Sequence, residues 1–343
     1  MTSRCRGAVA AVQSLATFSV VLLAAWSAGA ADVSLWVTLG DSDSLVEIDA
    51  NTFEELRRIK VGVRPHGLAA APDGSRIYVT CEEDGSFRAI DSVSGKTIAQ
   101  IPIGVDPNQL TVTRDGRTAY VPMRGENAIA VVQLDPLKLV KKLPADAGPH
   151  DAYTSVDGRN AFVGAMFGRS LHVIDTATHE IAYSIATESG VRPMEVSPDG
   201  RTLYVALTDL IGFVVVDLEA RKVTRRIELA TIPDGVPAPY HRTFTHALTL
   251  TPNGRELWVT DDVFNQVRVV SLPDMKEIAS IPTGYFPHWF TTRPDGKVIF
   301  ISAWYSNVVT AIDVKTRKVL ANIEFERGTG PKRILAVERK ASQ

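Results

Sequence analysis

A short turn sequence that recurs every 42 residues constrains this chain more than any other feature. Six Asp-Gly or Asn-Gly pairs follow one another at spacings of 42, 42, 42, 54 and 42 residues. The pairs begin at Asp73, Asp115, Asp157, Asp199, Asn253 and Asp295. Asp-Gly supplies the positive φ values that a tight hairpin needs. The spacing therefore predicts six copies of one β-rich unit, one of them with a 12-residue insertion.

The residues after each turn indicate four short strands per unit. An aromatic and small-apolar segment follows the turn, as in residues 77–80 and 257–260. Eighteen residues beyond the turn lies a second acidic position in four units, where the side chain can bond its own turn backbone. These residues are Asp91, Asp175, Asp217 and Asp313. Four strands in about 42 residues is the size of one β-propeller blade.

The two ends of the chain supply a seventh unit. Residues 34–38, 45–49 and 56–61 match the second, third and fourth strands of a blade, and residues 334–337 match the missing first strand. We therefore expect an all-β fold, a seven-bladed β-propeller of four-stranded antiparallel blades. The C-terminal strand would join the N-terminal blade and close the ring. An open solenoid is the alternative repeat architecture, but it does not predict a split blade, which removes exposed sheet edges.

The first thirty residues have the pattern of a secretory signal peptide. Arg4 and Arg6 are followed by an apolar stretch over residues 15–26 and then by Ser27-Ala28-Gly29-Ala30, a small-residue cleavage pattern. The stretch is too short to span a bilayer, and a signal anchor is the alternative. We expect cleavage near Ala30, a periplasmic or secreted protein, no membrane span after cleavage, and a single propeller domain over residues 31–343.

Composition and missing motifs narrow the functional classes. A net charge of −2 argues against a nucleic-acid surface, which needs a concentrated positive face. The chain contains no Gly-rich phosphate loop before a helix, no H-E-x-x-H, no C-x-x-C-H and no G-x-S-x-G. These absences disfavour nucleotide hydrolysis, covalent haem and serine-hydrolase chemistry. We expect a monomer.

The repeat resembles that of a known family. Tyr78-Val79-Thr80, with Pro72-Asp73-Gly74 before it and Ile90-Asp91 after it, resembles the YVTN-type β-propeller repeat. The resemblance covers nearly all of the predicted mature chain and implies the propeller fold. Relatives include periplasmic and surface proteins, and similar propellers include lactonase-like enzymes and haem-d1-binding proteins. No distinctive residue set places this chain in either of these last two groups.

One position of the repeat carries most of the candidate chemistry. The residues seven positions before each turn, with the corresponding C-terminal position, are His66, Asn108, His150, Arg192, His246, His288 and Lys332. Four of the seven histidines fall there. The position lies where the chain begins the innermost strand of each blade, so the side chains should surround the central axis. The alternative is structural: duplication would have spread a histidine that only caps a strand.

The residue types suggest two kinds of ligand. Imidazoles suit Cu, Fe and Zn, so His66, His150, His246 and His288 are candidate ligands of a divalent transition metal. Arg192 and Lys332 instead favour a small anionic molecule, since arginine can bind carboxylate or phosphate in a bidentate way. Asn108 is a candidate contact of the same small polar or anionic ligand.

Loops at the same end of the blades add further candidates. A general base needs a carboxylate within reach of substrate, and Glu82, Asp261 and Asp262 could supply one. Trp304 is a candidate ligand contact. The proline-rich insertion over residues 232–242 could place Tyr240 and His241 over the site.

Three functions follow from these residues. The first is a binding or accessory protein for a small polar ligand or a metal. The alternatives are a metal-dependent hydrolase, lyase or oxidase acting on a small anionic substrate, and a docking scaffold for another periplasmic protein. The sequence does not decide whether the protein is an enzyme.

Overall fold

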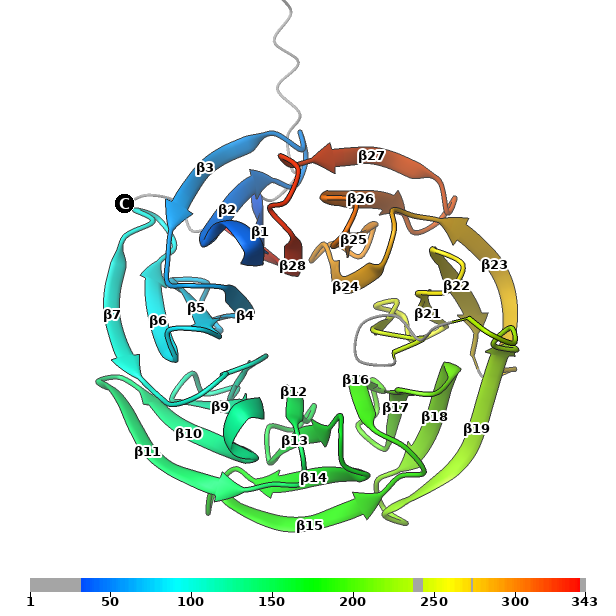
Figure 1. Ribbon diagram of the computed structural model, residues 1–343, viewed down its shortest axis with the longest axis horizontal. Helices are drawn as coiled ribbons and strands as arrows, with labels where there is room; N and C mark the ends of the chain where they lie inside the picture. Colours follow the sequence, from blue (N-terminus) through cyan, green and yellow to red (C-terminus); the bar gives the residue numbers. More distant parts are fainter. Residues whose placement is uncertain (1–31, 237–242, 273, 340–343) are drawn as a thin grey trace, which may run out of the picture. The chain divides into compact units, whose positions relative to one another are not determined.

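The computed structural model describes residues 32–236, 243–272 and 274–339. These residues form seven four-stranded antiparallel sheets, set as blades around a central axis (Figure 1). The expected all-β, seven-bladed propeller is therefore confirmed. Two short 3-10 helices, η1 (Gly40–Ser42) and η2 (Arg124–Glu126), interrupt the strands.

The first strand of each blade lies nearest the axis and the fourth lies at the rim, as Figure 1 shows for β4 and β7. Blade 1 consists of β28 (Pro331–Glu338), β1 (Val33–Leu39), β2 (Ser44–Asp49) and β3 (Glu55–Lys60). Blade 2 consists of β4 (Pro65–Ala70), β5 (Arg76–Cys81), β6 (Ser86–Asp91) and β7 (Thr97–Pro102). Blade 3 consists of β8 (Thr111–Val112), β9 (Thr118–Met123), β10 (Ala128–Leu134) and β11 (Leu137–Pro144).

The other four blades repeat this order. Blade 4 consists of β12 (Pro149–Thr154), β13 (Asn160–Ala165), β14 (Ser170–Asp175) and β15 (Glu180–Ala186). Blade 5 consists of β16 (Val191–Val196), β17 (Thr202–Leu207), β18 (Ile211–Asp217) and β19 (Lys222–Ala230). Blade 6 consists of β20 (Leu248–Leu250), β21 (Glu256–Asp261), β22 (Gln266–Ser271) and β23 (Lys276–Pro282). Blade 7 consists of β24 (Pro287–Thr292), β25 (Val298–Ala303), β26 (Val308–Asp313) and β27 (Val319–Glu324).

The recurring turn joins the first and second strands of a blade. In blade 3, the Asp115 carboxylate accepts a hydrogen bond from the Arg117 backbone N–H (3.0 Å), and Gly116 has a φ of 70°. The positive φ lies on the glycine and not on the aspartate. The second acidic position closes the outer turn, as Asp91 does by accepting from the Ser94 backbone N–H (2.7 Å). Both acidic positions therefore stabilise turns.

Strand burial explains where the core lies. Five of the six residues of β5 are buried, whereas β7 alternates between exposed and partly buried residues because only one of its faces packs inward. The buried side chains form clusters that join the facing sheets of adjacent blades. Trp36 and Trp258 are among the largest fully buried side chains.

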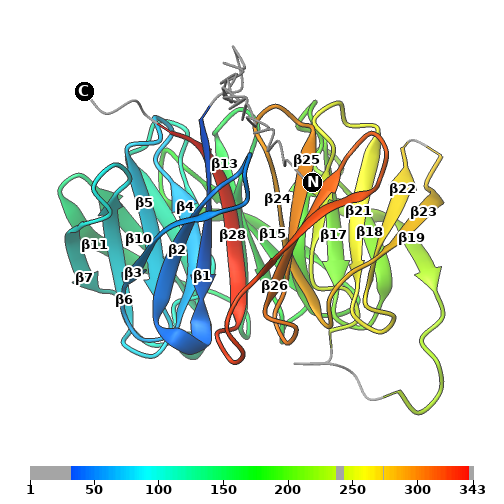
Figure 2. The same ribbon diagram turned by 90° about the horizontal axis from the view of Figure 1, so that it is seen from above.

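The ring closes through the two ends of the chain. β28 pairs antiparallel with β1, with Trp36 opposite Leu335 and Val37 opposite Ile334. Figure 2 shows these two strands side by side. The predicted closure by the C-terminal strand is thus confirmed, and it covers the edge that β1 would otherwise expose.

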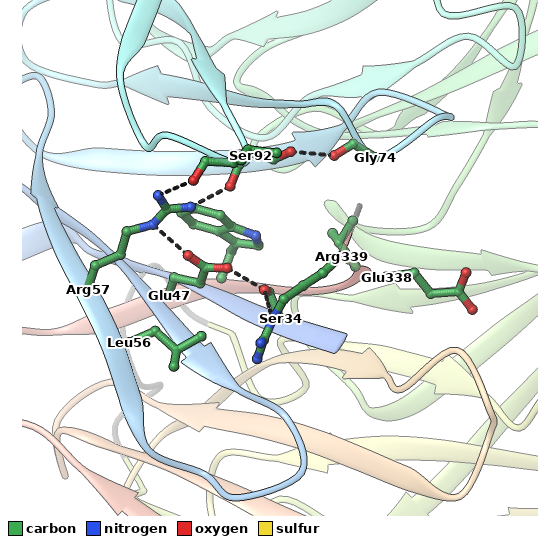
Figure 3. Close-up of a pocket in the computed structure, with 11 residues that line it drawn as sticks. Ser34, Glu47, Leu56, Arg57, Gly74, Ser92, Glu338 and Arg339 are labelled. Carbon is green, nitrogen blue, oxygen red and sulfur yellow. Dashed lines mark hydrogen bonds and ion pairs between the residues drawn. The ribbon is translucent and has the colours of Figure 1, made fainter. Parts of the chain in front are cut away.

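A small polar cluster secures this closure at a pocket of about 310 Å³ (Figure 3). Arg339, just after β28, donates to Ser34 Oγ of β1 (2.9 Å), and Ser34 in turn donates to the Glu47 carboxylate. Arg57 bridges the same carboxylate and the backbone carbonyls of residues 92 and 93 in the next blade. Arg57 therefore joins blades 1 and 2, and Arg339 joins the end of β28 to β1.

Two expectations lie outside the described residues. The predicted signal peptide, residues 1–30, is one, and the proposed positions of Tyr240 and His241 are the other. Across the described ranges, no helix has the length and apolar character that crossing a membrane requires.

Candidate functional site

The antiparallel blades bring two sets of candidate residues to the same end of the propeller. In blade 2, Pro65 at the start of β4 pairs with Cys81 at the end of β5, so His66 lies near Glu82. In blade 7, Pro287 pairs with Ala303, which places His288 near Trp304 in the same way. Residues far apart in the sequence therefore meet where the innermost strands begin.

The seven residues on the repeat position form what we call the axial cluster. Its members are His66, Asn108, His150, Arg192, His246, His288 and Lys332. The ring centroids of His66 and His150 are 6.2 Å apart, those of His150 and His246 are 5.7 Å apart, and those of His246 and His288 are 3.7 Å apart. The structure therefore brings the four imidazoles together from four blades.

Burial keeps these imidazoles neutral. The four rings belong to residues that are between 1% and 4% exposed. Burial lowers the pKa of His66 to about 3, and the positive charges of Lys332 and Arg124 add to the effect. Burial and the charge of Arg192 likewise hold the pKa of His150 and of His246 well below 6.5. A neutral imidazole offers one hydrogen-bond donor and one acceptor.

Several buried polar atoms of the cluster lack a hydrogen-bond partner among the described residues. These atoms are Asn108 Oδ1, His150 Nδ1, His288 Nδ1 and the neighbouring Trp289 Nε1. His246 differs, because its Nδ1 lies 2.9 Å from the backbone carbonyl oxygen of His288. Buried polar groups are almost always hydrogen-bonded in folded proteins. A concentration of unpartnered groups at one place therefore marks it as a candidate binding site.

Glu82 is the charged centre of one side of the cluster. Its carboxylate accepts hydrogen bonds from Arg64 Nε (2.8 Å), Asn108 Nδ2 (3.0 Å), Lys332 Nζ (3.1 Å) and Arg124 Nη2 (3.3 Å). Burial raises the pKa of Glu82, but the surrounding positive charges outweigh this effect and lower it to about 2. Glu82 is therefore ionised and faces three cations.

The opposite side of the cluster carries a further buried cation. Arg192 is fully buried, and its Nη1 lies 3.5 Å from Met166 Sδ. Burial and the neighbouring Asp261 hold the pKa of the nearby Asp262 well above its usual range. The axial cluster thus holds two buried cations, Arg192 and Lys332, and Lys332 is paired with Glu82.

The other predicted carboxylate, Asp261, has a local structural role. It accepts hydrogen bonds from Arg268 Nε (2.7 Å) and from the backbone N–H groups of residues 263 and 264. These bonds hold the loop between β21 and β22. Burial raises the pKa of Asp262, whereas the positive charges around Glu82 lower the pKa of Glu82.

Trp304 completes the site on the side of blade 7. Its indole Nε1 donates to the Asp41 carboxylate (2.8 Å), and Lys332 Nζ lies 4.6 Å from the centre of its ring. A pocket of about 810 Å³ opens beside Glu82 at the same end of the blades. It is lined by Arg64, Glu82, Glu83, Val105, Asp106, Arg124 and Phe167.

Sequence reasoning missed several residues of this site. Arg64 contacts Glu82, but the corresponding positions of the next blades hold Asp106 and Gly148, so the repeat gives no signal there. Trp289 stacks on His150 with ring centroids 6.1 Å apart and an interplanar angle of 8°. Asp151 follows His150 directly, and burial raises its pKa to about 7. A search of the position after each axial residue would have found the last two.

The described residues do not present an assembled metal centre. Within these ranges, no three His, Cys, Asp or Glu side chains are arranged to hold one ion together. His246 and His288 instead lie face to face, with an interplanar angle of 29°. The metal at the four histidines stays a prediction.

Comparisons with known proteins agree with the fold. Residues 90–191 match the YNCE-like β-propeller family model. No curated protein is detectably similar in sequence.

Three solved structures share the fold at low sequence identity. Hydrazine synthase of Kuenenia stuttgartiensis is 21% identical over 76% of this chain and 86% of that chain, with a TM-score of 0.67. The dihydro-haem d1 dehydrogenase NirN, solved in complex with DHE, is 14% identical over 88% and 74%, with a TM-score of 0.63. A candidate 6-phosphogluconolactonase from Bacteroides uniformis is 18% identical over 90% and 100%, with a TM-score of 0.73. The blade count, the matched repeats and these neighbours support the resemblance seen in the sequence, that of a seven-bladed propeller built from YVTN-type repeats.

Proposed function

We propose that this protein binds a small anionic molecule at the axial cluster, as an exported binding or accessory protein. The observation that carries the proposal is that imidazole nitrogens of His150 and His288, without partners among the described residues, lie in a cluster with two buried cations. Arg192 and Lys332 are buried there, and Glu82 is the ionised carboxylate among them. A small anion would be attracted to these cations, because charges interact strongly in the low-dielectric interior.

The polar atoms of the cluster suit the same ligand. A guanidinium group can hold a carboxylate or phosphate through two parallel hydrogen bonds, which Arg192 could provide. Neutral imidazoles add N–H donors without adding charge. His150 and His288 each have a buried Nδ1 without a partner among the described residues. An anion bound here could accept hydrogen bonds from the imidazole N–H groups and from the positively charged guanidinium group of Arg192.

An enzyme acting on a small anion is the second candidate, and Asp262 is the residue that favours it. A carboxyl group that stays protonated near neutral pH can act as a general acid. Asp262 is buried, and burial raises its pKa well above its usual range. Glu82, with a pKa of about 2, would be a weak base.

Calorimetric titration tests the proposed binding. Acetate, succinate and inorganic phosphate would be titrated into the mature protein at pH 7.5. We expect at least one to bind, and Arg192→Gln and His150→Gln each to weaken it about tenfold or more, as for hydrogen bonds to charged groups. Arg201→Gln, on an exposed turn of blade 5, is the matched control and should bind as the unmodified protein does. No binding of any of the three anions would refute the proposal.

Metal content and export need separate measurements. Elemental analysis of protein purified without chelator tests the metal prediction at the four axial histidines.

N-terminal sequencing of protein recovered from outside the cytoplasm tests the signal peptide, for which we expect a mature chain beginning at Ala31. A cytoplasmic protein that retains residues 1–30 would contradict export.

A further inference from the structure

Blade 7 differs from the others at the end where the axial cluster lies. Four aromatic side chains come together there from two loops, the one before β24 and the one after β25. They are Tyr285, Phe286, Trp304 and Tyr305. In the other blades, the positions that correspond to Trp304 and Tyr305 hold pairs such as Glu82 and Glu83 or Thr208 and Asp209. The aromatic group is therefore an addition to the repeat, and the blade fold does not require it.

The aromatic rings form a row, which we call the aromatic ladder: Trp304, Tyr305 and Tyr285. The ring centroids of Trp304 and Tyr305 are 5.5 Å apart, with an interplanar angle of 12°. Those of Tyr305 and Tyr285 are also 5.5 Å apart, with an angle of 30°. Phe286 packs against the row, with its ring centroid 5.2 Å from that of Tyr305.

The ladder runs from the surface to a buried cation. Tyr285 and Tyr305 are 57% and 48% exposed, whereas Trp304 is 6% exposed. At the buried end, Lys332 Nζ lies 4.6 Å from the centre of the Trp304 ring and 3.1 Å from the Glu82 carboxylate. Exposed aromatic patches on soluble proteins commonly mark binding sites. This patch is continuous with the charged groups of the axial cluster.

The chemistry of the two ends defines one kind of ligand. Flat aromatic faces prefer to stack on another flat ring, and a buried ammonium group prefers a negative charge. We infer that the ligand is an aromatic carboxylate, with its ring on the aromatic ladder and its carboxylate toward Lys332. This inference rests on the proposed anion binding and names the class of the anion.

Three matched compounds separate the ring from the charge. The probes are 3-phenylpropanoate, its ring-saturated analogue 3-cyclohexylpropanoate, and the uncharged 3-phenylpropanamide, each titrated calorimetrically at pH 7.5. We expect 3-phenylpropanoate to bind about two- to tenfold more tightly than the saturated analogue, from the usual strength of aromatic stacking. We expect it to bind about tenfold or more tightly than the amide, from the usual strength of a charged hydrogen bond.

Three variants assign these preferences to residues. Tyr305→Ala should abolish the preference for the aromatic ring and leave binding of the saturated analogue unchanged. Lys332→Gln should weaken the binding of both carboxylate probes. In this variant Glu82 keeps Arg64 and Arg124 as partners. Phe264→Ala is the control, because Phe264 lies on a loop at the same end, in blade 6, and is also 48% exposed. Phe264→Ala should bind the three compounds as the unmodified protein does.

The outcomes distinguish this inference from the function on which it rests. Equal binding of the two carboxylates would overturn the aromatic ligand and leave anion binding intact. Binding of succinate or phosphate, without binding of either propanoate, would do the same. A preference for the ring that survives Tyr305→Ala would also overturn it, by placing the ring elsewhere. Failure of all the anions to bind would refute both proposals.

Discussion

Replacing His66 by glutamine should make the protein less sensitive to acid. Burial lowers the pKa of His66 from 6.5 to about 3 in the folded state. Below pH 6.5 the unfolded chain therefore takes up a proton on this residue that the folded protein does not. The unfolded state gains stability as a result, so the free energy of unfolding decreases as the pH falls from 6.5 toward 3. Glutamine cannot take up this proton.

The size of the effect follows from the two pKa values. At pH 5 the unfolded His66 lies about 1.5 pH units below its own pKa, and the folded His66 is still neutral. At about 1.36 kcal/mol per unit, this difference costs the unmodified protein about 2 kcal/mol. At pH 7.5 the cost is close to zero. The stability of His66→Gln relative to the unmodified protein should therefore improve by about 2 kcal/mol between pH 7.5 and pH 5.

Urea unfolding at the two pH values measures this difference directly. The direct cost of losing the imidazole is present at both pH values and cancels. Asp151 and Glu195, whose pKa values burial raises to about 7, act in the opposite direction but are present in both proteins. Gln109→Asn, a buried change near the axis that alters no titrating group, should show no such pH dependence. An equal stability difference at both pH values would show that His66 is accessible to protons, contrary to the structure.

Three further predictions concern the charged centre, the ring closure and the cysteine. Glu82→Gln should lower the free energy of unfolding by about 3 kcal/mol, because it removes the carboxylate with which the buried Lys332 is paired. Glu83→Gln, at a side chain that is 59% exposed, should cost less than about 1 kcal/mol. Equal costs in urea unfolding would contradict the central role of Glu82. Ile334→Ala should cost about 2 to 5 kcal/mol by the same measurement, since this buried residue of β28 fills the joint between the chain ends. Cys81 is fully buried, and burial raises its pKa to about 11. Iodoacetamide at pH 8 should therefore label this thiol about 100-fold more slowly in the folded protein than in urea. Equal labelling rates would place the thiol at the surface.

The fold could be predicted because its information is periodic. A 42-residue repeat with one turn at a constant position defines four strands, and the unmatched strands at the two ends define the split blade. The pairing of Val37 with Ile334 across almost the whole chain follows from the need to cover two sheet edges. Even the meeting of His66 and His150 at the axis follows from the period, because equivalent positions of a closed ring face the same centre.

The site was predictable only where it follows the repeat. Arg64 escaped notice because the corresponding positions of the other blades hold unrelated residues. In the aromatic ladder, Tyr285 lies in the loop before β24, whereas Trp304 and Tyr305 follow β25 about twenty residues further along the chain. Their contact depends on how two loops of one blade meet.

The sequence alone determined which residue types surround the axis, and the tertiary structure decided their charge. Glu82 and Lys332 are 250 positions apart, and their pairing at 3.1 Å exists only because the ring closes. Asp261 and Asp262 are adjacent, but Asp261 is ion-paired to Arg268, whereas burial raises the pKa of Asp262. The free energy of a charge depends on its distance to other charges and to water, and folding sets both distances.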